Sequence, residues 1–133
     1  MVLARGGGLL SQLTLPVKLF SGTSFASGKQ WQSWIHIEDL VALISHVLKL
    51  RIGGVFNAVA PNPVQQSEMT TAIGCVLKKP IVCPNVSESL LKLMLGEMSA
   101  IVLESQRVCA KKIQQTGFKF KFHEISAALK SLV

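Results

Sequence analysis

QWQSWIHIEDLVALISHVL, residues 30–48, places a strand-like segment directly before the clearest helical pattern in the chain. Residues 30–37 are rich in Trp and Ile and predict a short extended segment. The residues that follow carry apolar side chains at the spacing of one helix face: Leu40, Leu43, Ile44, Val47 and Leu48. Glu38 and Asp39 supply the negative charge that a helix N-terminus favours. A strand followed by a helix, repeated along the chain, predicts the α/β class.

The remaining segments continue this alternation. Further helices are predicted over residues 9–20, 67–77, 87–95, 110–115 and 123–132. Short strands are predicted over residues 55–60, 80–84 and 118–122, the last from three Phe that alternate with Lys. Pro16 is expected to bend or end the first helix, and Gly53-Gly54 to end the helix that begins near residue 38.

Composition excludes several classes of protein. The chain has 133 residues, 49% of them hydrophobic, which suits one folded domain and excludes disorder. No apolar run reaches the roughly 18 residues of a membrane span, so we expect a cytoplasmic protein with no membrane partner. The net charge of +7 comes largely from scattered lysines, so we expect no nucleic-acid partner. The three Cys and three His lack metal-site spacing, so we expect reduced thiols and no metal.

Several blocks, taken in order, resemble one family over essentially the whole chain. They are VLARGGGLL (2–10), SGKQWQSWIHIEDL (27–40), APNPV (60–64), KKP (78–80), MLGEM (94–98), SQRV (105–108) and TGFKFKF (116–122). The chain thus resembles the C-terminal portion of an epimerase-like short-chain dehydrogenase/reductase of the nucleoside-diphosphate-sugar epimerase type. The resemblance includes that family's uncharacterised C-terminal domain.

This resemblance implies an architecture. Residues 1–60 would be the last elements of the nucleotide-binding half, the tail of a Rossmann-type NAD(P)-binding fold. Residues 61–133 would be a small C-terminal substrate-side lobe of helices and short strands, and the two parts would form one compact unit. The full-length family is expected to use NADP and a Tyr-xxx-Lys catalytic pair, both located upstream of Met1.

The residues present do not supply that chemistry. Gly6-Gly7-Gly8 and Gly53-Gly54 lack the GxGxxG spacing that lets a backbone approach a pyrophosphate at a helix N-terminus. The sequence contains no tyrosine, so it cannot supply the phenol that acts as general acid/base in this family. We therefore expect that the chain binds no cofactor by itself and has no catalytic residue of its own.

Candidate binding residues come from the resemblance, which places Gln30, Trp31, Trp34 and His36 near the hinge between the two halves. Two Trp and a His could bind a flat or sugar-like ligand. In the alternative interpretation, the tryptophans pack the lobe and His36 donates to a backbone carbonyl.

Two charged residues also allow both a functional and a structural interpretation. Arg5 lies beside the glycine run and could contact a phosphate, since a Gly-rich turn exposes backbone N–H groups; the alternative is a solvated Arg. Asp39 is expected to cap a helix and not to act as a catalytic carboxylate.

The leading hypothesis is a substrate-side lobe that is not catalytic on its own. Its expected partner is the missing N-terminal Rossmann half, or a second copy through self-association, and its small-molecule substrate is unknown. Such a lobe should expose an apolar face when alone. The alternative is a stand-alone binding or interaction module derived from that family.

Overall fold

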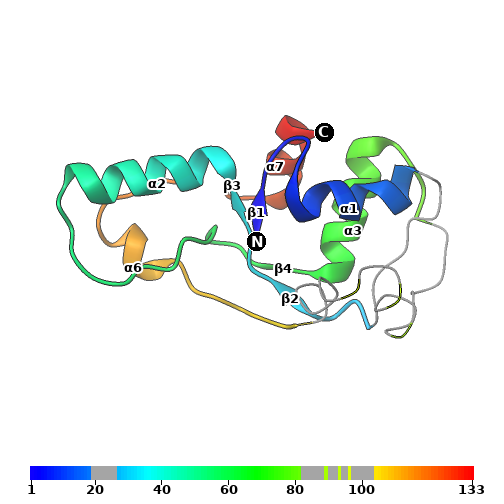
Figure 1. Cartoon of the computed structure of the whole chain (residues 1–133), viewed down its shortest axis with the longest axis horizontal. Coiled ribbons are helices and arrows are strands. Elements are labelled where there is room, and N and C mark those ends of the chain that lie inside the picture. Colours follow the sequence, from blue (N-terminus) through cyan, green and yellow to red (C-terminus); the bar gives the residue numbers. More distant parts are fainter. Residues whose placement is uncertain (19–26, 82–88, 90–92, 94–95, 97–103) are drawn as a thin grey trace.

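The structure, a computed structural model, describes residues 1–18, 27–81, 89, 93, 96 and 104–133. Short strands at its centre separate α2 and α6 at one end from α1, α3 and α7 at the other (Figure 1). The elements are β1 (Val2–Leu3), α1 (Gly8–Lys18), β2 (Trp31–Gln32), β3 (Ile35–His36), α2 (Ile37–Lys49), β4 (Val64–Gln65), α3 (Gln66–Leu77), α6 (Lys111–Gln114) and α7 (Ile125–Leu132). Among the described residues, no helix has the length and apolarity needed to cross a membrane.

The strands form two small sheets. In the first, β1 pairs with β3 in parallel, with Val2 opposite Ile35. A parallel pair needs a crossover connection, which begins here with α1. In the second, β2 pairs with β4 in antiparallel, with Trp31 opposite Gln65. Helices that alternate with short strands confirm the predicted α/β class.

The apolar side chains gather in two clusters, one at each end of the molecule. The first joins α1, α3 and α7 around Trp34, and includes Leu3, Leu13, Met69, Ile73, Phe122 and Leu129. The second lies under α2 and α6, and includes Ile35, Leu43, Val59, Ile113, Phe118 and Phe120. Both clusters draw residues from each side of position 60, so the two predicted parts share their cores. The domain boundary at residue 60 stays a prediction.

Two predicted strands are absent from the described residues. Residues 55–60 have no regular structure, and Val55 is 81% exposed, so only the end of this segment, Val59 and Ala60, is buried. Residues 118–122 keep the predicted alternation of buried Phe and exposed Lys, but they pair with no strand. The elements predicted over 80–84 and 87–95 lie almost wholly outside the described residues.

Helix ends also differ from the prediction. Pro16 lies inside α1, which continues to Lys18, so the alternative that Pro16 ends the helix is wrong; the alternative that it bends the helix stays a prediction. The helix α2 ends before Gly53-Gly54, in a Schellman motif where Ile52 N donates to Val47 O and Arg51 N to Leu48 O. Arg51, not a glycine, takes the left-handed conformation there, with φ of 51°. Lys78 does the same at the end of α3, with φ of 53°.

Glycine at either of these two positions is expected to stabilise the fold. Arg51→Gly or Lys78→Gly should raise the free energy of unfolding by roughly 0.5–1 kcal/mol, because glycine adopts positive φ without a Cβ clash. Urea denaturation followed by circular dichroism measures this change. Lys49→Gly, inside the last turn of α2, is the control and should destabilise by about 1 kcal/mol. If both Arg51→Gly and Lys78→Gly lowered the free energy of unfolding, the idea that positive φ strains these two residues would be wrong.

Candidate functional site

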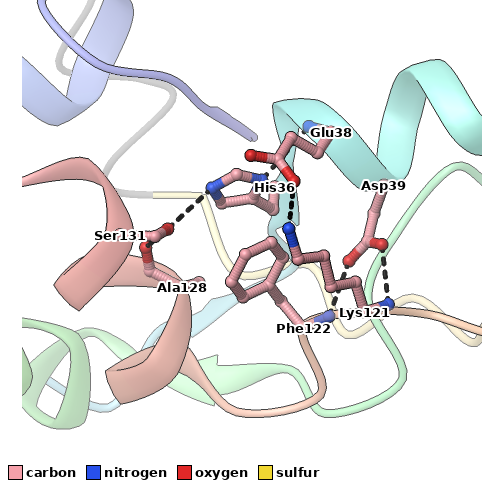
Figure 2. A network of polar contacts seen from close by, with 7 residues as sticks. All are labelled: His36, Glu38, Asp39, Lys121, Phe122, Ala128 and Ser131. Atoms are coloured by element: carbon pink, nitrogen blue, oxygen red, sulfur yellow. Dashed lines mark hydrogen bonds and ion pairs between the residues drawn. The ribbon is translucent and has the colours of Figure 1, made fainter.

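The first parallel strand pair ends where α2 begins, and His36 occupies that junction. His36 is 1% exposed and is the N-cap of α2, where its Nδ1 accepts a hydrogen bond from Glu38 N at 3.1 Å. Its Nε2 lies 3.0 Å from Ser131 Oγ, and that hydroxyl donates to Ala128 O at 2.7 Å (Figure 2). The hydroxyl proton is thus engaged elsewhere, so Nε2 is the donor to Ser131. These contacts define a neutral imidazole with its proton on Nε2.

The imidazole also packs against Phe122, with ring centroids 3.9 Å apart. Burial lowers the pKa of His36 below its ordinary value of 6.5, against the opposing effect of the carboxylates of Glu38 and Asp39, while Lys121 lowers it further. A proton on Nδ1 would point at the N–H of Glu38 and abolish the cap. The interpretation that His36 donates to a backbone carbonyl is therefore wrong: it donates to a hydroxyl and accepts from a backbone N–H.

Asp39 connects the start of α2 with the C-terminal segment. Its carboxylate is 2% exposed and accepts from the backbone N–H groups of Lys121 at 2.8 Å and Phe122 at 2.9 Å (Figure 2). Above it, Lys121 Nζ forms an exposed ion pair with Glu38 at 2.6 Å. The predicted capping role of Asp39 is thus wrong, because His36 caps the helix. Asp39 instead takes the backbone hydrogen bonds that a neighbouring strand would have accepted.

Trp34 lies in the core. It is 0% exposed, and its indole Nε1 donates to Asn62 O at 2.9 Å. Asn62 in turn donates through Nδ2 to Glu124 Oε1 at 2.8 Å, which ties the turn after residue 60 to the start of α7. In this arrangement, the faces of the Trp34 ring pack against protein.

Trp31 has a different environment. It is partly exposed, and the guanidinium of Arg107 lies over its ring, 4.5 Å from the centroid. Beside it is a half-open pocket of about 310 Å³, whose lining includes Trp31, Ser33, Val59, Glu104, Gln106 and Val108. Of the four predicted ligand-binding residues, Trp31 is the one that borders this pocket.

Hydrogen bonds hold the segment 104–108 against β2. Gln106 N donates to Trp31 O at 3.0 Å, and Trp31 N donates to Ser105 Oγ at 3.1 Å. Ser33 Oγ donates to Gln106 O at 2.7 Å and accepts from Val108 N at 2.9 Å. Sequence reasoning missed Ser33, Gln106 and Arg107 as parts of this site. The signals that could have indicated them are the SQRV block, which contains Gln106 and Arg107, and the SGKQWQSWIHIEDL block, which contains Ser33.

Gln30 and Arg5 lie away from the pocket lining. Gln30 is buried just before β2, where its carbonyl accepts from Gln66 N at 2.9 Å. Arg5 is exposed in the turn between β1 and α1, beside Gly6 with φ of 69°. Because this turn follows the carboxyl end of β1, it lies on the side where open α/β sheets bind ligands. Among the described residues, no group of three or more His, Cys, Asp or Glu is placed to hold a metal.

Comparison with known proteins gives consistent matches. Residues 86–132 match a family described as a domain of unknown function (DUF1731). The whole chain is 40% identical to the chloroplastic epimerase family protein SDR39U1 homolog of Arabidopsis thaliana, of which it covers 38%, and 36% identical to epimerase family protein SDR39U1 of Mus musculus, of which it covers 46%. The chain thus spans less than half the length of these curated relatives.

Two solved structures share the fold. The crystal structure of human epimerase family protein SDR39U1 (isoform 2) with NADPH matches 98% of this chain and 45% of that one, with a TM-score of 0.89 and 33% identity. The nucleoside-diphosphate sugar epimerase from Corynebacterium glutamicum matches 98% of this chain and 24% of that one, with a TM-score of 0.72 and 30% identity. This chain matches the C-terminal part of epimerase family proteins.

The family match confirms the resemblance found in the sequence. The network around His36 and Asp39 stabilises the fold, because His36, Asp39 and Phe122 are buried and contact one another or the backbone. The half-open pocket beside Trp31 is the part of the site that a ligand can reach. The binding roles expected for Gln30, Trp31, Trp34, His36 and Arg5 stay predictions.

The Asp39 carboxylate is expected to contribute strongly to stability. Asp39→Ala should lower the free energy of unfolding by about 2–3 kcal/mol, because two backbone donors lose a charged acceptor; Asp39→Asn, which keeps one oxygen, should cost about half as much. Urea unfolding gives these values. Glu38→Gln is the control. It removes only an exposed ion pair, so it should leave the midpoint of urea unfolding nearly unchanged. Equal effects of Asp39→Ala and Glu38→Gln would disprove the assignment.

His36 is expected to make stability depend on pH. Its pKa is lower in the folded chain than in the unfolded one, so its contribution is complete above pH 6.5 and declines as pH falls toward the lowered folded value. Unfolding experiments at about pH 7.5 and about pH 5.5 should show this loss. His36→Asn keeps a side chain that can cap the helix but does not titrate. It should therefore remove the contribution of His36 to the pH dependence of stability. His46 and His123 are present in the wild-type chain and in the His36→Asn variant. If stability depended on pH equally in the two, His36 would be excluded as the source of that dependence.

Proposed function

We propose that this chain is the substrate-side C-terminal lobe of an NADP-dependent short-chain dehydrogenase/reductase of the epimerase family. It acts together with a nucleotide-binding half that carries the cofactor glycine motif and the catalytic Tyr-Lys pair. The observation that carries this proposal is the parallel pair of β1 and β3, whose two-residue strands are too small to form a stable sheet by themselves.

The free edge of β1 supports a partner that adds strands. Parallel sheets occur almost only in α/β proteins, with several strands and with helices on both faces. Among the described residues, β1 pairs only with β3. The side chain of Val2 is 42% exposed, although its neighbour Leu3 is completely buried. A parallel strand of a Rossmann-type half, placed along this edge, would satisfy the backbone of β1 and cover Val2.

The helix α2 presents a second uncovered surface. Leu40, Leu43 and Val47 face the cluster under α2 and α6. Beside this buried face, Val41, Ile44 and Leu48 form an exposed apolar stripe that continues it around the helix. The apolar surface of α2 is therefore wider than the part that its own core covers, and such surface is normally buried. The stripe therefore supports a partner that packs along α2, as a helix or sheet face of the nucleotide-binding half would.

The chemistry is divided between the two parts in this proposal. NADPH is present in the solved structure of the human relative. In our proposal, the nucleotide-binding half supplies most contacts to this cofactor, and Arg5 contacts a phosphate. Substrate lies against Trp31, with Gln30 beside it, and the buried Trp34 and His36 support that surface. The cytoplasmic location expected from the sequence is kept as part of the proposal.

Co-expression tests the proposal directly. We expect this chain to form a one-to-one complex with the nucleotide-binding half of the Arabidopsis thaliana relative, and the complex to bind NADPH. Chromatography with light scattering measures the complex, and NADPH fluorescence measures cofactor binding. The chain alone should bind no NADPH and should self-associate through its exposed apolar stripe.

Matched variants of α2 sharpen this test. Ile44→Glu should weaken the complex by at least roughly tenfold, because it buries a charge in an apolar contact. Ala42→Glu adds the same charge on the same helix, outside the stripe, and should have little effect. A chain that stays monomeric in the presence of the nucleotide-binding half and binds a ligand tightly by itself would instead support a stand-alone binding module.

A further inference from the structure

The far end of the molecule carries a group of exposed cations and aliphatic side chains, which we call the basic tip. Its cations are Lys49, Arg51, Lys111 and Lys112, and its aliphatic residues are Leu50 and Val55. All of them are exposed, with Leu50 at 56% and Val55 at 81%. The tip combines the C-terminal end of α2 and the loop after it with α6 (Figure 1).

Specific contacts join these two segments into one surface. Lys112 Nζ donates to Val55 O at 2.7 Å and lies 4.9 Å from the centre of the Phe56 ring. Asn57 Nδ2 donates to Cys109 O at 3.3 Å, on the segment that leads into α6. His46 Nε2 lies 3.0 Å from Thr116 Oγ1, just after α6. The cations of α2 and α6 are therefore held at the same end of the fold.

The charge of the tip is not balanced by its own segments. The sequence has no Asp or Glu between residues 40 and 67, or between residues 105 and 123. Among the described residues of these segments, the four cations share their surface with aliphatic groups, small polar groups and the half-buried ring of Phe56. This combination complements a partner that is anionic and also accepts apolar side chains.

The backbone conformation at the end of α2 adds a cation to this surface. Arg51 occupies the left-handed position of the Schellman motif, where glycine is preferred and would carry no charge. Here, the conformation places one more cation on the tip.

We propose that the basic tip binds the surface of an anionic lipid bilayer. Lys49, Arg51 and Lys111 contact headgroup phosphates, while Leu50 and Val55 enter the interfacial layer. Nucleic acid fits less well, because the most exposed apolar side chains of the tip, Leu50 and Val55, are aliphatic, and the half-buried Phe56 ring already has Lys112 over it. This binding is peripheral and needs no spanning segment, so it departs from the expectation of no membrane partner, which rested on the absence of such a segment. It does not depend on the proposed enzyme function.

Vesicle co-sedimentation tests the proposal with two lipid compositions. The chain should bind vesicles of equal parts phosphatidylserine and phosphatidylcholine, and should not bind vesicles of phosphatidylcholine alone. Each cation near such a surface contributes roughly fivefold to binding, so Lys49→Gln with Lys111→Gln should weaken binding by roughly 20- to 30-fold. Lys29→Gln with Lys130→Gln removes the same charge from exposed positions elsewhere and should weaken it much less.

Two further comparisons separate the tip from general properties of the chain. Leu50→Ser should weaken vesicle binding, while Leu15→Ser, at a position with nearly the same exposure (57%), should not. Arg51→Gly should weaken binding roughly fivefold although it does not destabilise the fold, which a purely structural role of Arg51 would not produce. Circular dichroism confirms that each variant is folded.

Three results would overturn the proposal. The first is equal loss of binding in the two double-lysine variants, since binding would then follow net charge alone. The second is equal binding to both kinds of vesicle. The third is binding to duplex DNA that is as strong as binding to the anionic vesicles and equally sensitive to Lys49→Gln with Lys111→Gln, which would identify a nucleic-acid surface.

Discussion

The junction between β3 and α2 depends on one buried carboxylate. Asp39 accepts the backbone N–H groups of Lys121 and Phe122, more than eighty residues further along the chain. This contact holds the Phe-rich segment against α2 and thereby directs Phe118 and Phe120 into one cluster and Phe122 into the other. His36, stacked on Phe122 and bound to Ser131, adds α7 to the same junction. The two ends of the molecule are therefore joined by side chains at the beginning of a single helix.

This junction explains why the sequence indicated some elements and not others. The apolar spacing of α2 and the polar residues before it are local, so the helix could be predicted from a short window. The strand predicted over 118–122 has the correct alternation, but its N–H groups bind Asp39 in place of a neighbouring strand. A contact between positions 39 and 122 leaves no local signal. The end of α2 was misplaced for a different reason, because Arg51 adopts a conformation for which glycine is the usual signal.

The candidate site shows the same limit at the level of side chains. Trp31 and Trp34 are three residues apart and equally suited to ligand binding by residue type. The structure buries Trp34 against the core, whereas Trp31 borders a pocket that the segment 104–108 completes. The family resemblance could be read from ordered blocks along the whole chain, and the absence of tyrosine and of a cofactor glycine turn could be read from the sequence as well. The partners of each residue depend on contacts over long sequence distances, and those needed the structure.

The central claim is that β1 and the exposed stripe of α2 are the surfaces that a nucleotide-binding half covers. Hydrogen–deuterium exchange of this chain, with and without that half, tests the claim most directly. We predict that protection increases in residues 1–3 and along α2, while exchange in α3 and α7, already packed against each other, changes little. Protection confined to α3 and α7, or an unchanged pattern under conditions where a complex forms, would contradict this account of the fold as one lobe of a larger enzyme.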